Sequence, residues 1–286
     1  MSTPLDELIA LLRVADGAGD RFVGRSEDLG WGTVYGGQVL GQAVLAASRT
    51  VGTERAMHSL HAYFLERGDV AQSVEYAVER IRDGGAFTTR RVVASQAAGP
   101  IFNLAASFQR AETGFVHQDE MPAAPPPESL PTELERLAAR VATYPPKMRE
   151  RALRERPFDV RAVESPAEEG TKRPPSRLLW FRAAGPLPDD TALHTALLAY
   201  VTDYAFLGTA LLPHGVTWLT PGVQAASLDH VMWIHEAPRV DGWHLYAMES
   251  PVATGARGLV RGRIFRADGK LVATTAQEGL LRIRRA

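Results

Sequence analysis

The hydrophobic pattern changes from a helical to a strand-like spacing in the first third of the chain. Residues 36–51, GGQVLGQAVLAASRTV, are apolar over a length that suits a buried helix. The stretches that follow are rich in β-branched and aromatic residues and are separated by Gly-rich or Asp-Gly turns, which predicts an antiparallel meander. These stretches are residues 58–69, 73–85, 87–99 and 100–110.

The last third of the chain repeats this order. Residues 189–206 predict a second long helix, and the strand-like stretches after it are residues 223–237, 242–253, 257–269 and 270–284. The two copies can be aligned with Ser59 over Ser227 and with Ser107 over Gln277. One long helix followed by antiparallel strands, twice, predicts a tandem α+β fold. We expect each sheet to wrap its helix and the two sheets to pair edge to edge, as in a pseudo-dimer.

Prolines locate the boundary between the copies. Eleven of the nineteen prolines lie between Pro122 and Pro175, which indicates an interdomain connection. Two short charged helices are expected in it, around residues 131–142 and 147–156. The predicted organisation is an N-terminal unit over residues 1–115, a Pro-rich linker over 116–178 and a C-terminal unit over 179–286.

Composition excludes several classes of function. The net charge of -1 over 286 residues predicts no general attraction to nucleic acid or to an anionic membrane. The absence of cysteine excludes disulfides, thiolate metal sites and cysteine nucleophiles, and it suits a reducing cytoplasm. The N-terminus has acidic residues ahead of its apolar ones and lacks the basic region of a signal peptide, so we expect a cytoplasmic protein. Residues 191–212 approach membrane-spanning length, but His194 and Asp203 favour a core helix over membrane insertion.

Familiar catalytic motifs are missing from the sequence. There is no GxSxG, no GxxxxGK[ST] and no GxGxxG after a strand, which argues against an α/β-hydrolase elbow and against nucleotide-binding folds. The histidines show no metal-ligand spacing: the pairs His58/His61 and His230/His235 stand at odd intervals in expected strands, so the two members of each pair point to opposite faces. We therefore expect no metal and no cofactor.

Three polar side chains interrupt the apolar elements of the second copy. Asp203 lies in the middle of the predicted helix, where a carboxylate on an apolar face needs a partner. Ser227 opens the first strand of that copy, and Gln277 lies near the end of its last strand. Each also has a structural interpretation, as a paired acid or as a satisfied strand residue, and Asp229 is a rival acid. Together, the carboxylate, hydroxyl and amide suit the positioning and activation of a hydrolytic water without a covalent intermediate.

Several long blocks resemble one known family. Residues 24–47 (GRSEDLGWGTVYGGQVLGQAVLAA), HSLHAYFLERGD and RDGGAFTTRRVVASQ are similar to the N-terminal half of the type II acyl-CoA thioesterases. SLDHVMWIHE and ARGLVRGRIFRADGKLVATTAQEG are similar to the C-terminal half of that family. The resemblance covers nearly the whole chain, from about Leu8 to Arg282, and it implies a double hotdog, which is two tandem units of a long helix wrapped by an antiparallel sheet.

The resemblance also implies the activity and the catalytic residues. The family hydrolyses acyl-CoA to a free fatty acid and coenzyme A, using Asp, Thr or Ser, and Gln, which fall on Asp203, Ser227 and Gln277 of this chain. Relatives commonly carry Thr at the position of Ser227; the hydroxyl is kept, with a less fixed rotamer. The implied mechanism is direct attack of water, with Asp203 as general base, Ser227 and Gln277 orienting the water, and backbone N–H groups near a helix start holding the oxyanion. A homo-oligomer is also implied.

Some parts of the binding site and two rival functions stay open. Tyr200 and Phe206 are candidates to line an apolar tunnel for the acyl chain. The candidates for a basic rim around the coenzyme A phosphates are Arg90, Arg91, Arg257, Arg261 and Arg263. One alternative function is a non-catalytic acyl-CoA-binding protein with the same fold. The other is an enoyl-CoA hydratase, which needs an Asp/His pair, whereas His194 stands about 13 Å from Asp203 along a helix.

Overall fold

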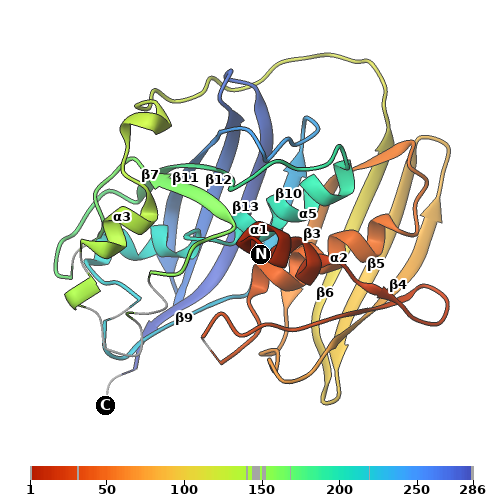
Figure 1. The fold of residues 1–286 in the computed structure, drawn as a ribbon, viewed down its shortest axis with the longest axis horizontal. Helices are drawn as coiled ribbons and strands as arrows, with labels where there is room; N and C mark the ends of the chain where they lie inside the picture. Colours follow the sequence, from red (N-terminus) through yellow and green to blue (C-terminus); the bar gives the residue numbers. More distant parts are fainter. Residues whose placement is uncertain are drawn as a thin grey trace.

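A computed structural model of the protein describes residues 2–30, 32–139, 141–143, 149, 153–167, 169–218 and 220–284. Figure 1 shows two units side by side, each with a long helix packed against the curved face of a sheet. The tandem repeat of helix and antiparallel strands agrees with the α+β prediction.

The N-terminal unit is built around helix α2, Gly36–Ser48, whose apolar side chains are buried against the strands. A short helix, α1 (Pro4–Leu12), packs on α2 and begins with a capping box between Thr3 and Asp6. The strands of this unit are β1 (Ala15–Asp16), β2 (Arg21–Gly24), β3 (Arg55–Phe64), β4 (Val74–Asp83), β5 (Phe87–Gln96) and β6 (Gly99–Arg110). All of its neighbouring strands pair antiparallel, as the turn pattern predicts.

The C-terminal unit repeats this plan around helix α5, Thr191–Thr202. Its strands are β7 (Phe158–Ala162), β8 (Ser176–Ala183), β9 (Val223–Ser227), β10 (Asp229–Ile234), β11 (His244–Thr254), β12 (Arg257–Arg266) and β13 (Leu271–Ile283). A 3-10 helix, η3 (Leu207–His214), connects α5 to β9 and packs on β11 and β12.

The two sheets join at one seam. Strands β3 and β10 pair antiparallel, with His61 opposite Val231 at the centre, and this pairing makes one thirteen-stranded sheet. The sheet order is β1-β2-β4-β5-β6-β3-β10-β13-β12-β11-β8-β7, with β9 added to β13. The predicted edge-to-edge pairing of the two sheets is therefore confirmed.

The cross-strand pairs correct the alignment of the two copies. Because His61 and Val231 pair at the centre of the seam, corresponding residues of the two units are 170 positions apart in the sequence (231 minus 61). Leu60 therefore corresponds to His230. Leu60 pairs with Ala106, and His230 bonds Gln277, so Ala106 is the counterpart of Gln277. The alignment of Ser107 with Gln277 is one residue off because the β12–β13 turn is one residue longer than the β5–β6 turn.

The same interval shifts the other aligned pair. Subtracting 170 from 227 makes Met57 the counterpart of Ser227, so the alignment of Ser59 with Ser227 is two residues off.

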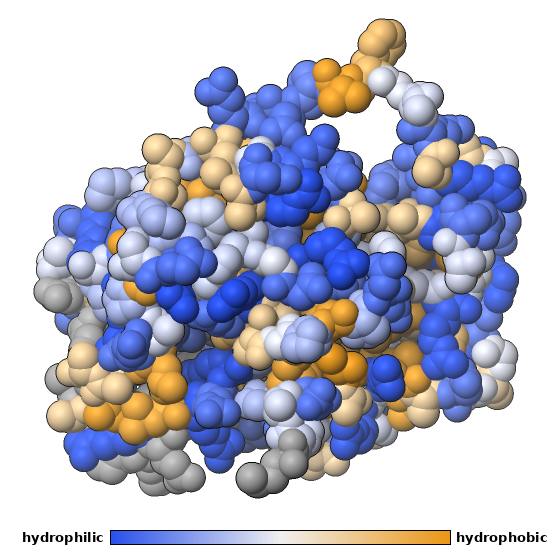
Figure 2. All heavy atoms as spheres, turned by 45° about the horizontal axis from the view of Figure 1, so that its top comes forward, coloured by the Kyte–Doolittle hydropathy of each residue, from blue (hydrophilic) through white to orange (hydrophobic). Residues whose placement is uncertain are grey.

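The segment between the units contributes more structure than its composition indicates. Strand β7 and the start of β8 lie within residues 116–178, because β7 pairs with β8 at the edge of the C-terminal sheet. Of the two expected helices, the first is α3 (Glu133–Ala138), and the second, at 147–156, lies largely outside the described residues. Two 3-10 turns, η1 (Pro127–Ser129) and η2 (Val141–Thr143), flank α3. Residues 111–120 are exposed and cross between the units as the arch at the top of Figures 1 and 2.

Helices α2 and α5 pack antiparallel at close range through two glycines. A Cβ added at Gly37 would clash with the carbonyl oxygen of Tyr200, and one added at Gly41 would lie 3.0 Å from that of Ala196. Only glycine allows backbones to approach this closely. The packing places the first turn of α2 beside the last turn of α5.

Helix α5 ends earlier than the hydrophobic pattern predicts. Its last residue is Thr202, and Asp203 is the C-cap residue, not a mid-helix residue. Ala205 adopts φ = 59°, a left-handed conformation that stops the helix and is unusual for a residue other than glycine. Residues 191–214 are long and apolar enough to cross a membrane, but an 18-residue window within them is 78% buried inside the protein, as in a core helix.

We predict that Gly37→Ala lowers the free energy of unfolding by about 1–3 kcal/mol, because the added methyl forces α2 away from α5. The loss occurs although alanine has the better helix propensity. Urea unfolding followed by circular dichroism measures it. Gly114→Ala is the control, since a Cβ there meets no atom within 4 Å. Equal stabilities of the two variants would contradict the proposed close packing.

Candidate active site

The three predicted site residues meet where α5 ends. Asp203 follows the helix, Ser227 is the last residue of β9, and Gln277 lies on β13. The Gln277 Nε2 group donates to Asp203 Oδ1 (3.1 Å) and to Ser227 Oγ. The Ser227 hydroxyl lies 3.4 Å from the same carboxylate oxygen. The structure thus brings all three side chains into one hydrogen-bonded cluster.

The cluster is fixed on one side and partly open on the other. Gln277 is 1% exposed and points inward with Ala273 and Thr275, as the strand alternation predicts. Asp203 and Ser227 are half-buried. The amide is therefore held in the core, while the carboxylate and hydroxyl are partly accessible to solvent.

His230 is a further residue of the cluster, and sequence reasoning considered it only as a metal ligand. Its side chain is fully buried, with Nδ1 2.7 Å from Gln277 Oε1 and Nε2 3.1 Å from Thr202 Oγ1. Its ring packs edge to face on Phe206. Burial lowers the pKa of His230, which favours the neutral imidazole. The signal that could have found it is the alternation of β10, where His230 and Met232 are the inward positions.

The start of α2 faces the carboxylate from the other unit. A Cβ added at Gly36 would lie 2.8 Å from Asp203 Oδ2, so the helix start and the carboxylate are close neighbours. The N-cap residue Tyr35 makes no side-chain cap. The first N–H groups of a helix lack intrahelical partners and carry a partial positive charge. This end of α2 therefore offers donors to a negative group.

Aromatic side chains surround the helix junction. The Tyr35 hydroxyl donates to the carbonyl of Tyr200 (3.1 Å), and the two rings meet edge to face at 5.1 Å. Phe158 stacks on Tyr200 at 6.2 Å. Burial raises the pKa of both Tyr35 and Tyr200, so both hydroxyls stay neutral. Phe206, the other candidate tunnel residue, is fully buried and stacks on Tyr246.

Asp229, the rival acid, is occupied elsewhere. Its Oδ1 accepts the backbone N–H of Glu278 at 2.6 Å, and burial raises its pKa. It begins β10 and bonds that strand to β13, whereas Asp203 is the acid bonded to Gln277.

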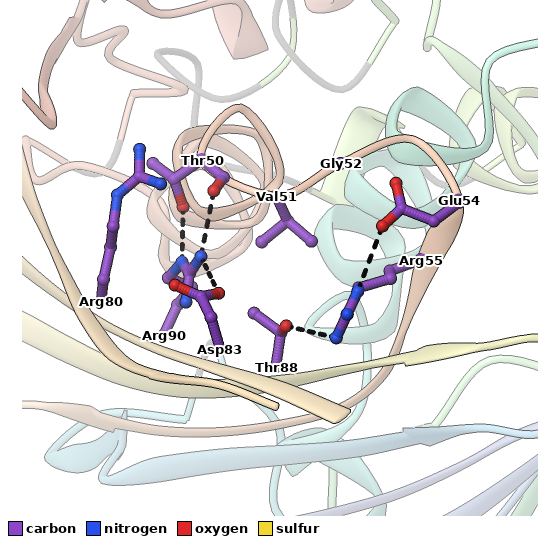
Figure 3. Close-up of a pocket in the computed structure, with 9 residues that line it drawn as sticks. All are labelled: Thr50, Val51, Gly52, Glu54, Arg55, Arg80, Asp83, Thr88 and Arg90. Carbon is purple, nitrogen blue, oxygen red and sulfur yellow. Dashed lines mark hydrogen bonds and ion pairs between the residues drawn. The ribbon is translucent and has the colours of Figure 1, made fainter. Parts of the chain in front are cut away.

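The five candidate rim arginines fall into two groups. Four are exposed and ion-paired on the sheet surface: Arg91 with Glu79, Arg257 with Glu278, Arg261 with Glu249 and Arg263 with Asp119. Arg90 is 1% exposed and points into a cleft of about 210 Å³ at the end of α2, shown in Figure 3.

This cleft lies at the counterpart of the Asp203 cluster in the N-terminal unit. Arg90 stands opposite Ala106 on the sheet, as Val260 stands opposite Gln277. The guanidinium donates to Thr50 Oγ1, to the Thr50 carbonyl and to Asp83, and also to two backbone carbonyls on β4 and β5. Its donors are already used within the protein, so Arg90 closes the cleft instead of binding a ligand. Within the described part of the chain, no three His, Asp or Glu side chains converge on a possible metal site.

Comparison with known proteins assigns both units of the chain to one enzyme family. A family model described as acyl-CoA thioesterase matches residues 148–280, and one described as acyl-CoA thioesterase N-terminal domain matches residues 26–109. The chain is 42% identical to acyl-CoA thioesterase 2 of Haemophilus influenzae over 99% of both proteins. It is 42% identical to human acyl-coenzyme A thioesterase 8, over 93% of this chain and 85% of the relative.

Solved structures give the same result. An acyl-CoA thioesterase II from Mycobacterium marinum superposes with a TM-score of 0.79 at 39% identity, covering 98% of each chain. A related protein from Mycobacterium avium subspecies paratuberculosis has a TM-score of 0.80 at 30% identity, over 98% of this chain and all of that one. The fold is therefore that of the double hotdog thioesterases. The chain belongs to the type II acyl-CoA thioesterase family.

We predict that Arg90→Met destabilises the protein far more than the neighbouring Arg91→Met. The first leaves the buried hydroxyl and carbonyl of Thr50 without their donor, which costs about 2–4 kcal/mol of unfolding free energy. The second breaks only an exposed ion pair with Glu79, which contributes little to stability because water screens it. Urea unfolding of both variants tests this, and similar midpoints would refute the structural role of Arg90.

Proposed function

We propose that the protein hydrolyses fatty acyl-CoA to a free fatty acid and coenzyme A by direct attack of water. The observation that carries this proposal is the convergence of the Asp203 carboxylate, the Ser227 hydroxyl and the Gln277 amide on one point. Ser227 and Gln277 orient the attacking water, the Gln277 hydrogen that points to Ser227 turning to the water oxygen, and Asp203 accepts the proton of the water. The water oxygen bonds to the thioester carbon, the C–S bond breaks, and the proton passes from Asp203 to the sulfur.

The surroundings of Ser227 support water as the nucleophile. A serine nucleophile is activated by an adjacent general base, most often an imidazole nitrogen that faces its hydroxyl. The nearest imidazole in the cluster is His230, whose two nitrogens face Gln277 and Thr202. The Ser227 hydroxyl therefore positions a water and is not itself activated.

The first turn of α2 is the proposed oxyanion site. Gly36 begins α2 in close contact with Asp203 and Phe64, so that even a Cβ at this position would clash with them. A thioester carbonyl bound beside the helix start would point its oxygen at the N–H groups of the first turn, where developing negative charge is stabilised. The aromatic wall of Tyr35, Tyr200 and Phe158 is the apolar surface proposed for the acyl chain beside this carbonyl.

The two alternative functions make different predictions. A non-catalytic acyl-CoA-binding protein would bind substrate without releasing thiol. A hydratase would need a histidine able to exchange protons with substrate, whereas His194 is buried and accepts the backbone N–H of Val240. Neither arrangement uses the Ser227–Gln277–Asp203 cluster, so hydrolysis is the function that the geometry favours.

We further propose a cytoplasmic enzyme of lipid metabolism that assembles as a homo-oligomer. A chain without cysteine suits a reducing compartment. Self-association is supported by Tyr63 and Trp233, which are 58% and 38% exposed on the outer face of the two seam strands. Sedimentation velocity at several protein concentrations tests the assembly.

We predict that Asp203→Asn folds normally and loses turnover about 10²- to 10⁴-fold, because the amide cannot accept the proton of the water. Thiol release from short-, medium- and long-chain acyl-CoA measures turnover, and the protein has no cysteine to react with the thiol reagent. Asp229→Asn is the matched control and is expected to keep most activity. Full turnover by the Asp203 variant, or its loss in the Asp229 variant, would move the base to Asp229.

A further inference from the structure

We propose that His230 is a positioning residue that fixes the orientation of the Gln277 amide, with its ring proton on Nδ1. The hydrogen bonds carry this assignment, and its effect on turnover rests on the hydrolytic function proposed above. The proposed chain of donation runs from Thr202 through His230 and Gln277 to Asp203 and Ser227.

The Gln277 amide can take two orientations that fill nearly the same space. A flip from one to the other exchanges the hydrogen-bond donor and the acceptor. In the observed one, both hydrogens of Nε2 are used, one toward Asp203 and one toward Ser227. After a flip of the amide, Oε1 would face the carboxylate and could no longer donate to it. The group that touches the other end of the amide therefore decides whether the site is assembled.

That group is His230. Its Nδ1 lies 2.7 Å from Gln277 Oε1, and a stable contact at this distance requires a hydrogen on Nδ1. A neutral imidazole carries one N–H, so Nε2 must accept, and its partner among the residues that the structure describes is the Thr202 hydroxyl at 3.1 Å. The Thr202 hydroxyl is then the donor that selects this tautomer, although the Ala199 carbonyl lies at 3.0 Å as a competing acceptor.

The charged groups near the ring agree with this direction of donation. Asp203 lies beyond the Gln277 amide, and Asp229 precedes His230 on its strand. Both interact favourably with a positive charge on the ring, but burial acts against that charge. The neutral tautomer with hydrogen on Nδ1 polarises the amide toward Asp203 without placing a net charge in the core.

The other unit shows that the fold itself does not need this histidine. Leu60 occupies the corresponding position of β3, fully buried, and its neighbour across the strands is Ala106. The polar pair His230–Gln277 is thus replaced by an apolar pair where the cluster is absent. A leucine at position 230 is consequently a change that this type of strand accommodates.

The experiment compares His230→Leu with His230→Asn. We expect kcat of the leucine variant to fall about 10- to 100-fold with KM within about twofold, because the amide loses its anchor while the substrate surface is unchanged. The asparagine amide can donate from nearly the Nδ1 position, and we expect it to restore kcat to within about fivefold of the wild type. Met232→Leu, an inward change on the same strand, controls for core packing.

A double-mutant cycle separates positioning from an independent role. If His230 acts through Gln277, then His230→Leu adds less than about twofold to the loss caused by Gln277→Ala. Fully additive losses, or a failed rescue by asparagine in a variant as stable as Met232→Leu, would overturn the proposal.

A second measurement does not depend on activity. Long-range ¹H–¹⁵N correlation spectra, assigned with the leucine variant, report which ring nitrogen of His230 carries the hydrogen. Hydrogen on Nδ1 supports the assignment, even if thioester turnover proves absent and the proposed function fails. Hydrogen on Nε2 overturns it, even if the protein is an active thioesterase.

Discussion

The close antiparallel approach of α2 and α5 is the constraint on which the site depends. Because Gly37 and Gly41 lie against backbone carbonyls of α5, the start of one helix reaches the end of the other. A carboxylate at a helix C-terminus, such as Asp203, is disfavoured by the dipole of its own helix. The start of α2 and the Gln277 amide offset this cost, and these groups are also the ones suited to bind a water and an oxyanion.

The fold is duplicated, but its polar chemistry is not. In the C-terminal unit, His230 and Gln277 lie under the end of α5, whereas Leu60 and Ala106 hold those positions in the N-terminal unit and Arg90 fills the space beside them. The first turns of α2 and α5 also differ between the two units. Asp190 caps α5 through the N–H of Leu193, while α2 starts without a side-chain cap. Buried polar groups cost free energy unless they are paired, so a single cluster limits that cost.

The sequence predicts the repeated parts of the fold better than the details that position the site. Helical and alternating patterns locate α2, α5 and the main strands, and the resemblance points to the three clustered residues. The apolar pattern does not predict the end of α5 at Thr202, because that end depends on the backbone of Ala205 and the pattern continues through it. The sequence places β7 and the start of β8 in the linker because its prolines and charges hide a short edge pairing. The role of His230 depends on which residue of β13 lies beside it. One extra residue in the β12–β13 turn shifts that position in the sequence, so the repeat does not reveal it.

Because residue 227 is a serine, its hydroxyl depends more on neighbouring side chains to hold it in place than a threonine hydroxyl would. A threonine side chain is restricted at χ1 by its methyl group, whereas serine rotates more freely. In the part of the chain that the structure describes, the Ser227 hydroxyl is held by two neighbours, the Asp203 carboxylate and the Gln277 amide. That amide holds its direction through His230, which in turn faces the Thr202 hydroxyl at the end of α5. Rigidity that a methyl group supplies locally is thus supplied here by a buried chain of hydrogen bonds, which begins one residue before Asp203 and returns to it.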